Sequence, residues 1–419
     1  MPDMVKIKKL AKKFISYTIE GEEKVYRLKH TPFCVKKHYT AFFHDELESL
    51  PIVPNKIILD NYMGKGYGCN CKYVTEALLR SGLDLELVWT VNDPEGMRKL
   101  FPEEVRLVRY GSAEAMREYA TAGVWAVNYQ LVHYLNKGLL KKPGQVYIQM
   151  WHGSFGIKKI ENDCGNLTCD TNWVTLAKRN SQYTDYWISN SDFETAIYRR
   201  AFWDVKEVLM YGHPRNDIFF GLGMRKAREA AERFIGKTGY RLLLYVPTFR
   251  DGRMQWEQEL DYRRLKLSLE QRFGGQWLIL ARLHPRMQAF RQMLPQEEFC
   301  ADVTDYPDIQ ELLAAADAVI TDYSSAVFDY LLTGRPAFIY APDYPDYEKL
   351  RGLYYPLTET PFSIARDNES LAKNVASFDE LVYKEKVRKF MAEKGSVEDG
   401  NAASRAAELI VSCIKKNRK

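Results

Sequence analysis

Several features that this sequence lacks limit what the protein can be. Its 7 cysteines are an odd number scattered through 419 residues, so we expect free thiols rather than a disulfide framework. No stretch approaches the roughly 20 consecutive apolar residues that a membrane-spanning helix needs. Lys and Arg number 60 against 55 Asp and Glu, and a net charge of +5 is too small to favour wrapping of duplex nucleic acid. We therefore expect no nucleic-acid partner.

Common ligand-binding motifs are also missing. There is no Gly-x-x-x-x-Gly-Lys-Ser/Thr phosphate loop, and the glycines at 64, 66 and 68 lack the correctly spaced third glycine of a dinucleotide fingerprint. Kinase and dehydrogenase functions are therefore disfavoured. The spacings Cys69-x-Cys71 and Cys164 to Cys169 match no zinc ribbon or finger, and no Asp-x-Asp pair is present. We expect a protein without a metal or a cofactor.

The composition is that of a folded protein with more than one domain. Apolar residues make up 46% of the chain and charged residues 27%. At about 100 to 200 residues per domain, the length predicts two or three domains. No short-period repeat suggests a solenoid or propeller.

The N-terminus is basic and amphipathic. Residues 5–15 place apolar side chains at helical spacing and lysines on the opposite side, which predicts a short helix that we assign to residues 1–20. Such a helix can lie on an anionic membrane surface or pack on the protein's own first domain, and the sequence alone leaves both open. Its lysines also interrupt the apolar region of a signal peptide, which predicts a cytoplasmic protein. We assign residues 406–419 to a basic C-terminal tail.

From residue 55 onward, apolar runs of strand length alternate with helical segments. A break at Gly221-Leu222-Gly223 separates two such series. Alternation of this kind predicts parallel sheets covered by helices on both faces. The expected fold is α/β with two doubly wound, Rossmann-like domains, at residues 21–222 and 223–405. The predicted strands are residues 56–60, 85–89, 104–109, 124–128, 145–149, 186–189, 241–246, 277–281, 318–321 and 337–340.

Chemistry is expected just after the strands, because ligands of doubly wound sheets bind beyond the carboxyl ends of the strands. In the first domain, His152 follows a strand and precedes Gly153, where an imidazole can act as a general base. A structural histidine at a sheet edge fits the same pattern. The adjacent lysines, 158 and 159, suit an anionic substrate or a solvated face.

Three strand ends of the second domain carry groups that suit phosphate. Arg282, His284 and Arg286 follow one strand, Thr248 and Arg250 follow another, and Asp322, Ser324 and Ser325 open a helix after a third. Guanidinium groups and helix N-termini bind phosphate oxygens, although arginines are often rim residues and Asp or Ser often only cap a helix. Together these groups suggest a nucleotide-diphosphate donor on the second domain and an acceptor activated by the first.

The series of motifs resembles the CDP-glycerol glycerophosphotransferase family of teichoic acid and capsule synthesis. The resemblance rests on the order of many short motifs between about residues 55 and 405. They include residues 70–73, 151–153, 211–217, 247–251, 283–285, 320–325, 328–329, 347 with 351–352, and Asp399-Gly400-Asn401-Ala402-Ala403-Ser404-Arg405, in which Ala403 stands where the family usually has serine.

The resemblance implies a glycosyltransferase-B fold, a CDP-glycerol donor and transfer of glycerol phosphate to an acceptor hydroxyl as CMP leaves. It also implies a lipid-linked or polymeric acceptor and attachment to the inner face of the membrane, which favours a membrane role for the basic helix. His152 is implied as the general base. The donor side is implied to include His284, Ser324, Ser325, Thr248, Arg250, Arg282, Asp322, His213 and, for the polyol, Asp329.

One departure concerns the presumed acceptor loop. After His152-Gly153 the family commonly continues Thr-Pro-Leu-Lys, whereas this chain has Ser154-Phe155-Gly156-Ile157 before Lys158. The acceptor is therefore open, as is the choice between CDP-glycerol and CDP-ribitol. A sugar-nucleotide glycosyltransferase and a non-catalytic binding protein on the same fold remain as alternatives.

Overall fold

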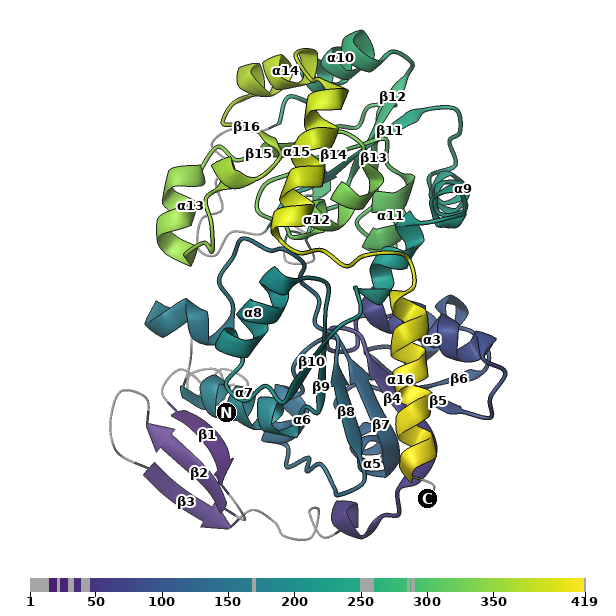
Figure 1. The fold of residues 1–419 in the computed structure, drawn as a ribbon, viewed down its shortest axis with the longest axis vertical. Helices are drawn as coiled ribbons and strands as arrows, with labels where there is room; N and C mark the ends of the chain where they lie inside the picture. The colour runs from purple at the N-terminus through teal and green to yellow at the C-terminus, as the bar shows by residue number, and fades with distance from the viewer. Residues whose placement is uncertain are drawn as a thin grey trace, which may run out of the picture.

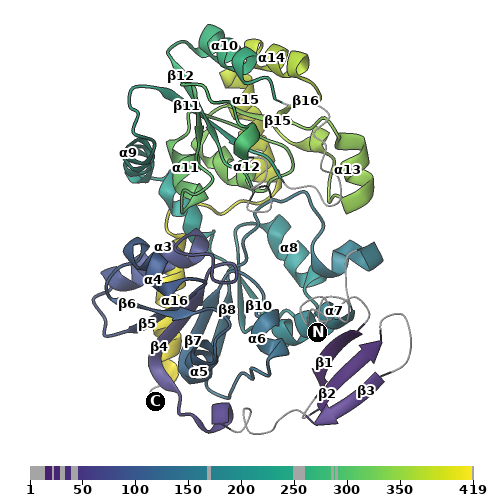
Figure 2. The same ribbon diagram turned by 180° about the vertical axis from the view of Figure 1, so that it is seen from behind.

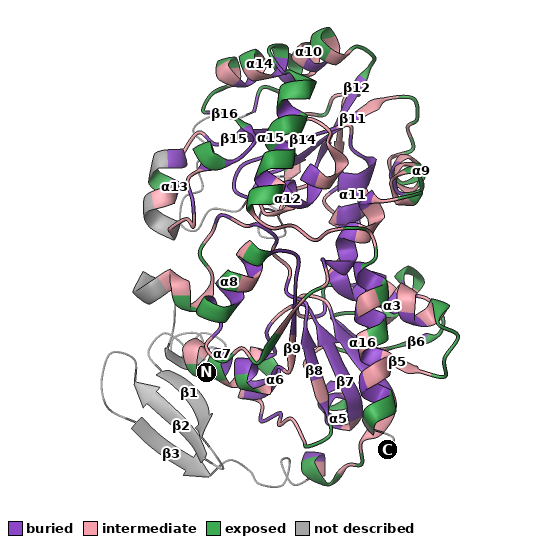
Figure 3. Ribbon diagram, viewed as in Figure 1, coloured by how far each residue is buried: buried purple, intermediate pink, exposed green. Residues whose placement is uncertain are grey.

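Two parallel β-sheets lie one above the other along the long axis of the molecule, each flanked by helices (Figure 1). The computed structural model describes residues 15–20, 23–28, 34–38, 46–167, 171–248, 260–284, 287 and 291–417. Figure 3 shows that the strands are largely buried, whereas most helices expose an outer face. The predicted architecture of two doubly wound α/β units is confirmed.

The first sheet has seven strands in the order β10-β9-β8-β7-β4-β5-β6, all parallel. Within this sheet the chain starts at β4, adds β5 and β6 on one side, and then returns to add β7 to β10 on the other side, which is the Rossmann order. This order predicts a ligand crevice where the direction reverses, between β4 and β7. Its runs of Val, Ile, Leu and Trp are buried on both faces, as parallel strands require. The strands are β4 (Val53–Asp60), β5 (Glu86–Val91), β6 (Val105–Arg109), β7 (Ala122–Val127), β8 (Val146–Gln149), β9 (Tyr186–Ser189) and β10 (Glu207–Met210).

Helices from both ends of the chain cover this sheet. One core cluster joins the sheet to α3 and α16, and the other joins it to α5, α6 and α7. The helices of the first half are α3 (Cys69–Arg80), α4 (Pro94–Met97), α5 (Ala113–Thr121), α6 (Val132–Asn136), α7 (Thr171–Tyr183) and α8 (Asp192–Ala201), with 3-10 helices η1 (Arg98–Leu100), η2 (Glu161–Leu167) and η3 (Pro214–Phe219).

The second sheet has six parallel strands in the order β13-β12-β11-β14-β15-β16, again the Rossmann order. Its strands are β11 (Arg241–Val246), β12 (Trp277–Ala281), β13 (Cys300–Asp302), β14 (Ala318–Thr321), β15 (Ala337–Tyr340) and β16 (Ser363–Ala365). Its helices are α9 (Gly223–Ile235), α10 (Tyr262–Phe273), α11 (Ile309–Ala315), α12 (Ala326–Tyr330), α13 (Tyr344–Arg351), α14 (Asn368–Ala376) and α15 (Glu380–Glu393), with η5 (Leu331–Thr333) and η6 (Leu357–Glu359).

The predicted basic tail is in fact a helix of the first domain's core. Helix α16 (Ala402–Asn417) returns from the second domain and lies along the first sheet in both views (Figures 1 and 2). Ala406, Ile410, Cys413 and Ile414 recur at helical spacing, on a helix that packs against α3, β4 and β7. Burial of this apolar face outweighs the basic character of the last residues, so the tail assigned to residues 406–419 is corrected.

The assignment of a helix to residues 1–20 is corrected in part. Residues 15–20 form strand β1 (Ile15–Glu20), which pairs antiparallel with β2 (Glu23–Leu28), and β2 pairs with β3 (Cys34–His38). Residues 1–14, which hold most of the expected basic helix, lie outside the described residues. Within the described part of the chain, no helix is long and apolar enough to cross a membrane.

Candidate active site

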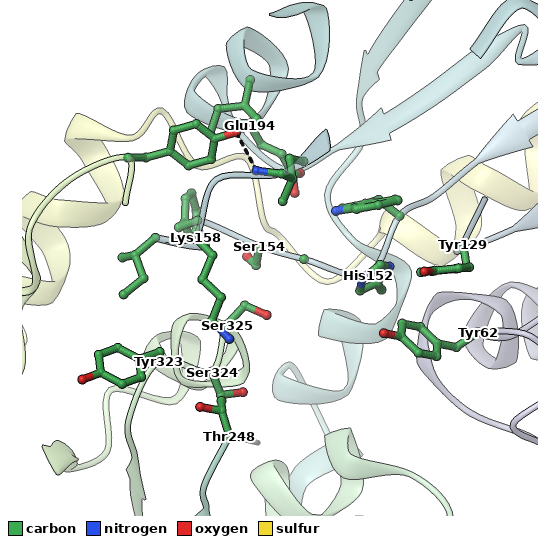
Figure 4. Close-up of a pocket in the computed structure, with 18 of the residues that line it drawn as sticks. Tyr62, Tyr129, His152, Ser154, Lys158, Glu194, Thr248, Tyr323, Ser324 and Ser325 are labelled. Atoms are coloured by element: carbon green, nitrogen blue, oxygen red, sulfur yellow. Dashed lines mark hydrogen bonds between the residues drawn. The ribbon is translucent and has the colours of Figure 1, made fainter. Parts of the chain in front are cut away.

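A pocket of about 500 Å³ lies where the carboxyl ends of the two sheets face each other (Figure 4). Both sheets contribute to its lining through the segments that follow β4, β7, β8, β11, β12 and β14. It brings together five of the ten residues predicted to be catalytic or to bind the donor, although they are up to 173 positions apart. These residues are His152, Thr248, His284, Ser324 and Ser325.

His152 is held in one tautomer. Its Nδ1 lies 3.0 Å from the backbone oxygen of Asn128, and because a carbonyl oxygen can only accept, Nδ1 carries the proton. Nε2 of the neutral ring therefore keeps its lone pair. Burial lowers the pKa of His152 to about 4, and the positive charges of Arg215 and Lys65 act in the same direction. His152 is thus neutral near pH 7 and can accept a proton there.

The backbone before His152 is strained and held in place. Trp151 has φ 50, a left-handed conformation that a bulky residue rarely adopts. The Asn70 side-chain amide donates to the carbonyls of Met150 and Trp151, at 3.0 Å each, while the Trp151 amide donates to Gln149 at 2.9 Å. These buried hydrogen bonds fix the segment from which the imidazole enters the pocket.

The glycine-rich loop after β4 supports the other side of His152. The Tyr62 amide donates to the Asn128 side chain at 2.8 Å, and the Tyr62 ring meets the imidazole edge-on at 4.9 Å. Gly64 has φ +75, and a Cβ there would lie 2.7 Å from the Cβ of Tyr110, so this position requires glycine. The sharp turn places Tyr62 and Lys65 in the pocket lining.

The opposite side of the pocket presents hydroxyl groups and the start of a helix. Ser325 is the N-cap of α12, and Ser324 precedes it. Figure 4 shows the Lys158 side chain extending toward these serines and Thr248, which defines a polar, cationic end of the pocket. Hydroxyls, a lysine and a helix start together can hold the oxygens of a phosphate.

The profile of the family described as CDP-Glycerol:Poly(glycerophosphate) glycerophosphotransferase matches residues 43–412. The chain belongs to that family. The resemblance and the enzyme class that it implied are therefore confirmed.

Relatives of this glycerophosphotransferase cover nearly the whole chain. The chain is 31% identical to the teichoic acid poly(glycerol phosphate) polymerase of Staphylococcus epidermidis. This match covers 87% of the chain but only 51% of the polymerase. The chain is 30% identical to the teichoic acid glycerol-phosphate transferase of Staphylococcus aureus, covering 90% of this chain and 98% of the relative. The structure of the wall teichoic acid polymerase TagF matches with a TM-score of 0.79 at 28% identity, covering 90% and 94% of the two chains. The expected glycosyltransferase-B type of fold is confirmed by this likeness.

Two residues predicted to bind the donor make hydrogen bonds within the protein, and their role in donor binding stays a prediction. The Arg282 guanidinium donates to the backbone oxygens of Val303 and Tyr306, so it holds the loop after β13. The Asp322 carboxylate is buried and accepts the backbone amide of Thr248 at 3.0 Å. Neither side chain belongs to the pocket lining.

Two further predicted donor residues belong to a buried network between the sheets. His213 is fully buried with Nε2 2.9 Å from Glu194, and Asp329 accepts Nε of Arg215 at 2.9 Å. Asp329 is therefore paired with a cation of the same chain, and its contact with the polyol stays a prediction. Arg250, also predicted on the donor side, lies outside the described residues.

Sequence reasoning missed the residues that position the site. Asn70 and Arg215 belong to motifs on which the family resemblance rests, but no role followed from their identity, because their partners lie 80 and 114 positions away. Among the described residues, no group of three or more His, Cys, Asp or Glu side chains could hold a metal ion. Five of the cysteines, at positions 69, 71, 164, 300 and 413, are free, as expected.

Proposed function

We propose that the protein transfers glycerol phosphate from CDP-glycerol to an acceptor hydroxyl and releases CMP. One observation carries the proposal: a neutral histidine with an available Nε2 lies across one pocket from hydroxyls, a lysine and a helix start that suit phosphate. The family of this chain and a TagF structure soaked with CDPG support the choice of donor.

The reaction follows from the placement of these groups. The acceptor hydroxyl loses its proton to Nε2 of His152 as its oxygen bonds to the phosphorus that bears glycerol. The bond from that phosphorus to the bridging oxygen breaks, and CMP leaves with the bonding pair. Phosphoryl transfer mainly needs positioning and stabilisation of charge on the phosphoryl oxygens, which Lys158, His284 and the hydroxyls of Ser324 and Ser325 would supply.

The acceptor that we propose belongs to a teichoic-acid-like or capsular polymer, either lipid-linked or already polymeric. Relatives of this chain include polymerases, a transferase and primases of teichoic acid, for both glycerol phosphate and ribitol phosphate. The donor is therefore the first thing to measure.

A donor panel tests the proposal. The full chain is incubated with CDP-glycerol, CDP-ribitol and common UDP-sugars, and nucleotide release is followed by chromatography. We expect the wild-type protein to release CMP from CDP-glycerol, and we expect the His284→Ala variant to lose this release. CMP from CDP-ribitol alone would correct the polyol, and UDP release with inert CDP-polyols would replace the proposed reaction by glycosyl transfer.

We also propose that the basic N-terminus attaches the protein to the inner face of the membrane. Because β1 starts at residue 15 and pairs with β2, deletion of residues 1–14 leaves that pairing intact. Flotation with vesicles containing anionic lipid should recover the full chain and lose the shortened one. Equal flotation of both forms would instead assign the segment to packing on the protein.

A further inference from the structure

Arg215 is a buried cation that lies between the two sheets, in η3. It is 3% exposed, yet its side chain reaches residues of both halves of the chain. Nη2 donates to the backbone oxygen of Gly153 at 2.6 Å, and Nε donates to the Asp329 carboxylate at 2.9 Å. One guanidinium therefore bridges the loop of the first domain to a helix of the second.

The two partners of Arg215 flank the two sides of the pocket. Gly153 directly follows His152, and Asp329 lies on α12, the helix that begins after Ser325. The backbone amide of Arg215 also donates to Asn70, at 3.1 Å, and Asn70 holds the two carbonyls before His152. Arg215 thus contacts the histidine loop by two routes and the serine-bearing helix by a third.

The surroundings of this pair fix it firmly. Asp329 also accepts from the side-chain amides of Asn216, at 3.2 Å, and Gln310, at 3.1 Å. Nη1 of Arg215 is buried and has no hydrogen-bond partner among the described residues, a desolvation cost that a purely structural residue would avoid. Because buried ion pairs stabilise folds poorly compared with apolar packing, a role in geometry is the better explanation for this one.

We propose that Arg215 is a positioning residue that ties the His152 loop to helix α12, and so sets the base against the phosphoryl group of the donor. The inference rests on the proposed function, because it assigns to His152 the role of base. Misplacement of reacting groups by about 1 Å can cost roughly 100-fold in rate, so a loosened tie should be visible in kcat.

Two variants separate positioning from folding. Arg215→Lys keeps the charge but loses the forked contact, and Arg215→Met combined with Asp329→Asn removes the charge pair without leaving a lone buried ion. Arg228→Lys is the matched control. The Arg228 guanidinium also donates to a carboxylate, that of Asp317, and to a backbone oxygen, that of Ala315, but it lies outside the pocket lining. Thermal unfolding, CDP-glycerol affinity and CMP release are measured for each.

We expect kcat to fall about 10- to 100-fold in both Arg215 variants while CDP-glycerol affinity stays within about twofold. The acid limb of kcat/KM should stay in place for Arg215→Lys and move to higher pH for the neutral double variant, because that variant loses the Arg215 charge that acts on His152, whereas the Asp329 charge lost with it is not among those acting on His152. The other titratable or charged groups around His152, which both variants retain, are Lys65, His213, Tyr62 and Tyr129.

The outcomes distinguish failure of this inference from failure of the function. If wild-type protein releases no CMP from any CDP-polyol, the proposed function fails and this inference fails with it. Two outcomes with an active wild type overturn the inference alone. In the first, the folded Arg215 variants keep the wild-type kcat. In the second, they lose activity only in proportion to unfolding, and the acid limb of the double variant does not move. Should Arg215→Lys not fold, the double variant decides by the same criteria.

Discussion

At the scale of single residues, the state of His152 depends on groups that are distant in sequence. A strand end and a following glycine were enough to predict a histidine in a pocket. Its protonation could not be predicted, because the carbonyl of Asn128 fixes the tautomer and the charge of Arg215 reaches it only through folding. Sequence position therefore identified the candidate, and packing determined its chemistry.

Replacing His152 by alanine should lower kcat about 100- to 10,000-fold, the range over which a general base contributes. CDP-glycerol affinity should change little, because the phosphate-binding groups lie on the other side of the pocket. CMP release and calorimetric binding check this. His133→Ala is the control, since His133 stacks on Tyr110 outside the pocket lining and its loss should leave kcat unchanged.

The pH dependence follows from the pKa of His152, which is lowered to about 4. The base works in its neutral form, so kcat/KM should be flat on the acid side down to about pH 5 and fall as the pH drops through about 4. The measurement is a pH series of CMP release, limited to the range in which far-UV circular dichroism shows folded protein. An acid limb near 6.5 would mean that His152 is not desolvated in the free enzyme.

At the scale of elements, prediction succeeded where the pattern is long and periodic. The central strands of the two sheets were predicted close to their observed bounds. The edge strands β10, β13 and β16 were missed, because β13 and β16 have only three residues each and all three strands are partly exposed, so they lack the apolar run of a central strand. The small sheet of β1, β2 and β3 was missed as well, because lysines at helical spacing dominated the N-terminal pattern.

The start of α12 gives a prediction at this scale. Loss of both hydroxyls in Ser324→Ala combined with Ser325→Ala should weaken CDP-glycerol binding at least about tenfold, because a hydrogen bond to a charged group contributes about 1.5–3 kcal/mol. Fluorescence or calorimetric titration measures this. Ser268→Ala, on α10 away from the pocket, should bind normally. Unchanged affinity in the double variant would place the donor phosphates elsewhere.

At the scale of the whole molecule, buried polar groups join the two sheets. Glu398, in the segment before α16, accepts from the side-chain amides of Asn190 and Asn216, at 3.1 and 2.7 Å, and from the backbone amide of His213. This junction could not be predicted, because its members are ordinary polar residues that come together only once both sheets have formed.

Burial raises the pKa of Glu398 to about 7, in spite of these donors. Between about pH 4.5 and pH 7, the folded state therefore keeps a proton on Glu398 that the unfolded state releases. The contribution of this proton to the free energy of unfolding is complete below about pH 4.5 and is lost as the pH rises through 7. We expect Tm to fall from pH 6 to pH 8, and to fall less in Glu398→Gln. Parallel slopes for both proteins, measured by differential scanning fluorimetry, would contradict this assignment.

The return of α16 to the first domain gives a further prediction. Ile410 is 1% exposed against the first sheet's core, so Ile410→Ala should cost about 2–5 kcal/mol of stability. Lys416→Ala, on the exposed side of the same helix, should cost almost nothing. Chemical denaturation of the two variants measures the difference, and equal midpoints would show that α16 does not contribute to this core.

The same helix has a consequence for how the protein is made. One face of the first sheet is covered only in part, by α3, until α16 has left the ribosome, after every residue of the second domain. The nascent first domain therefore exposes apolar strands throughout translation of the second, at a time when chaperones can bind them. Termination of translation anywhere in the second half would therefore leave the cores of both halves unfinished.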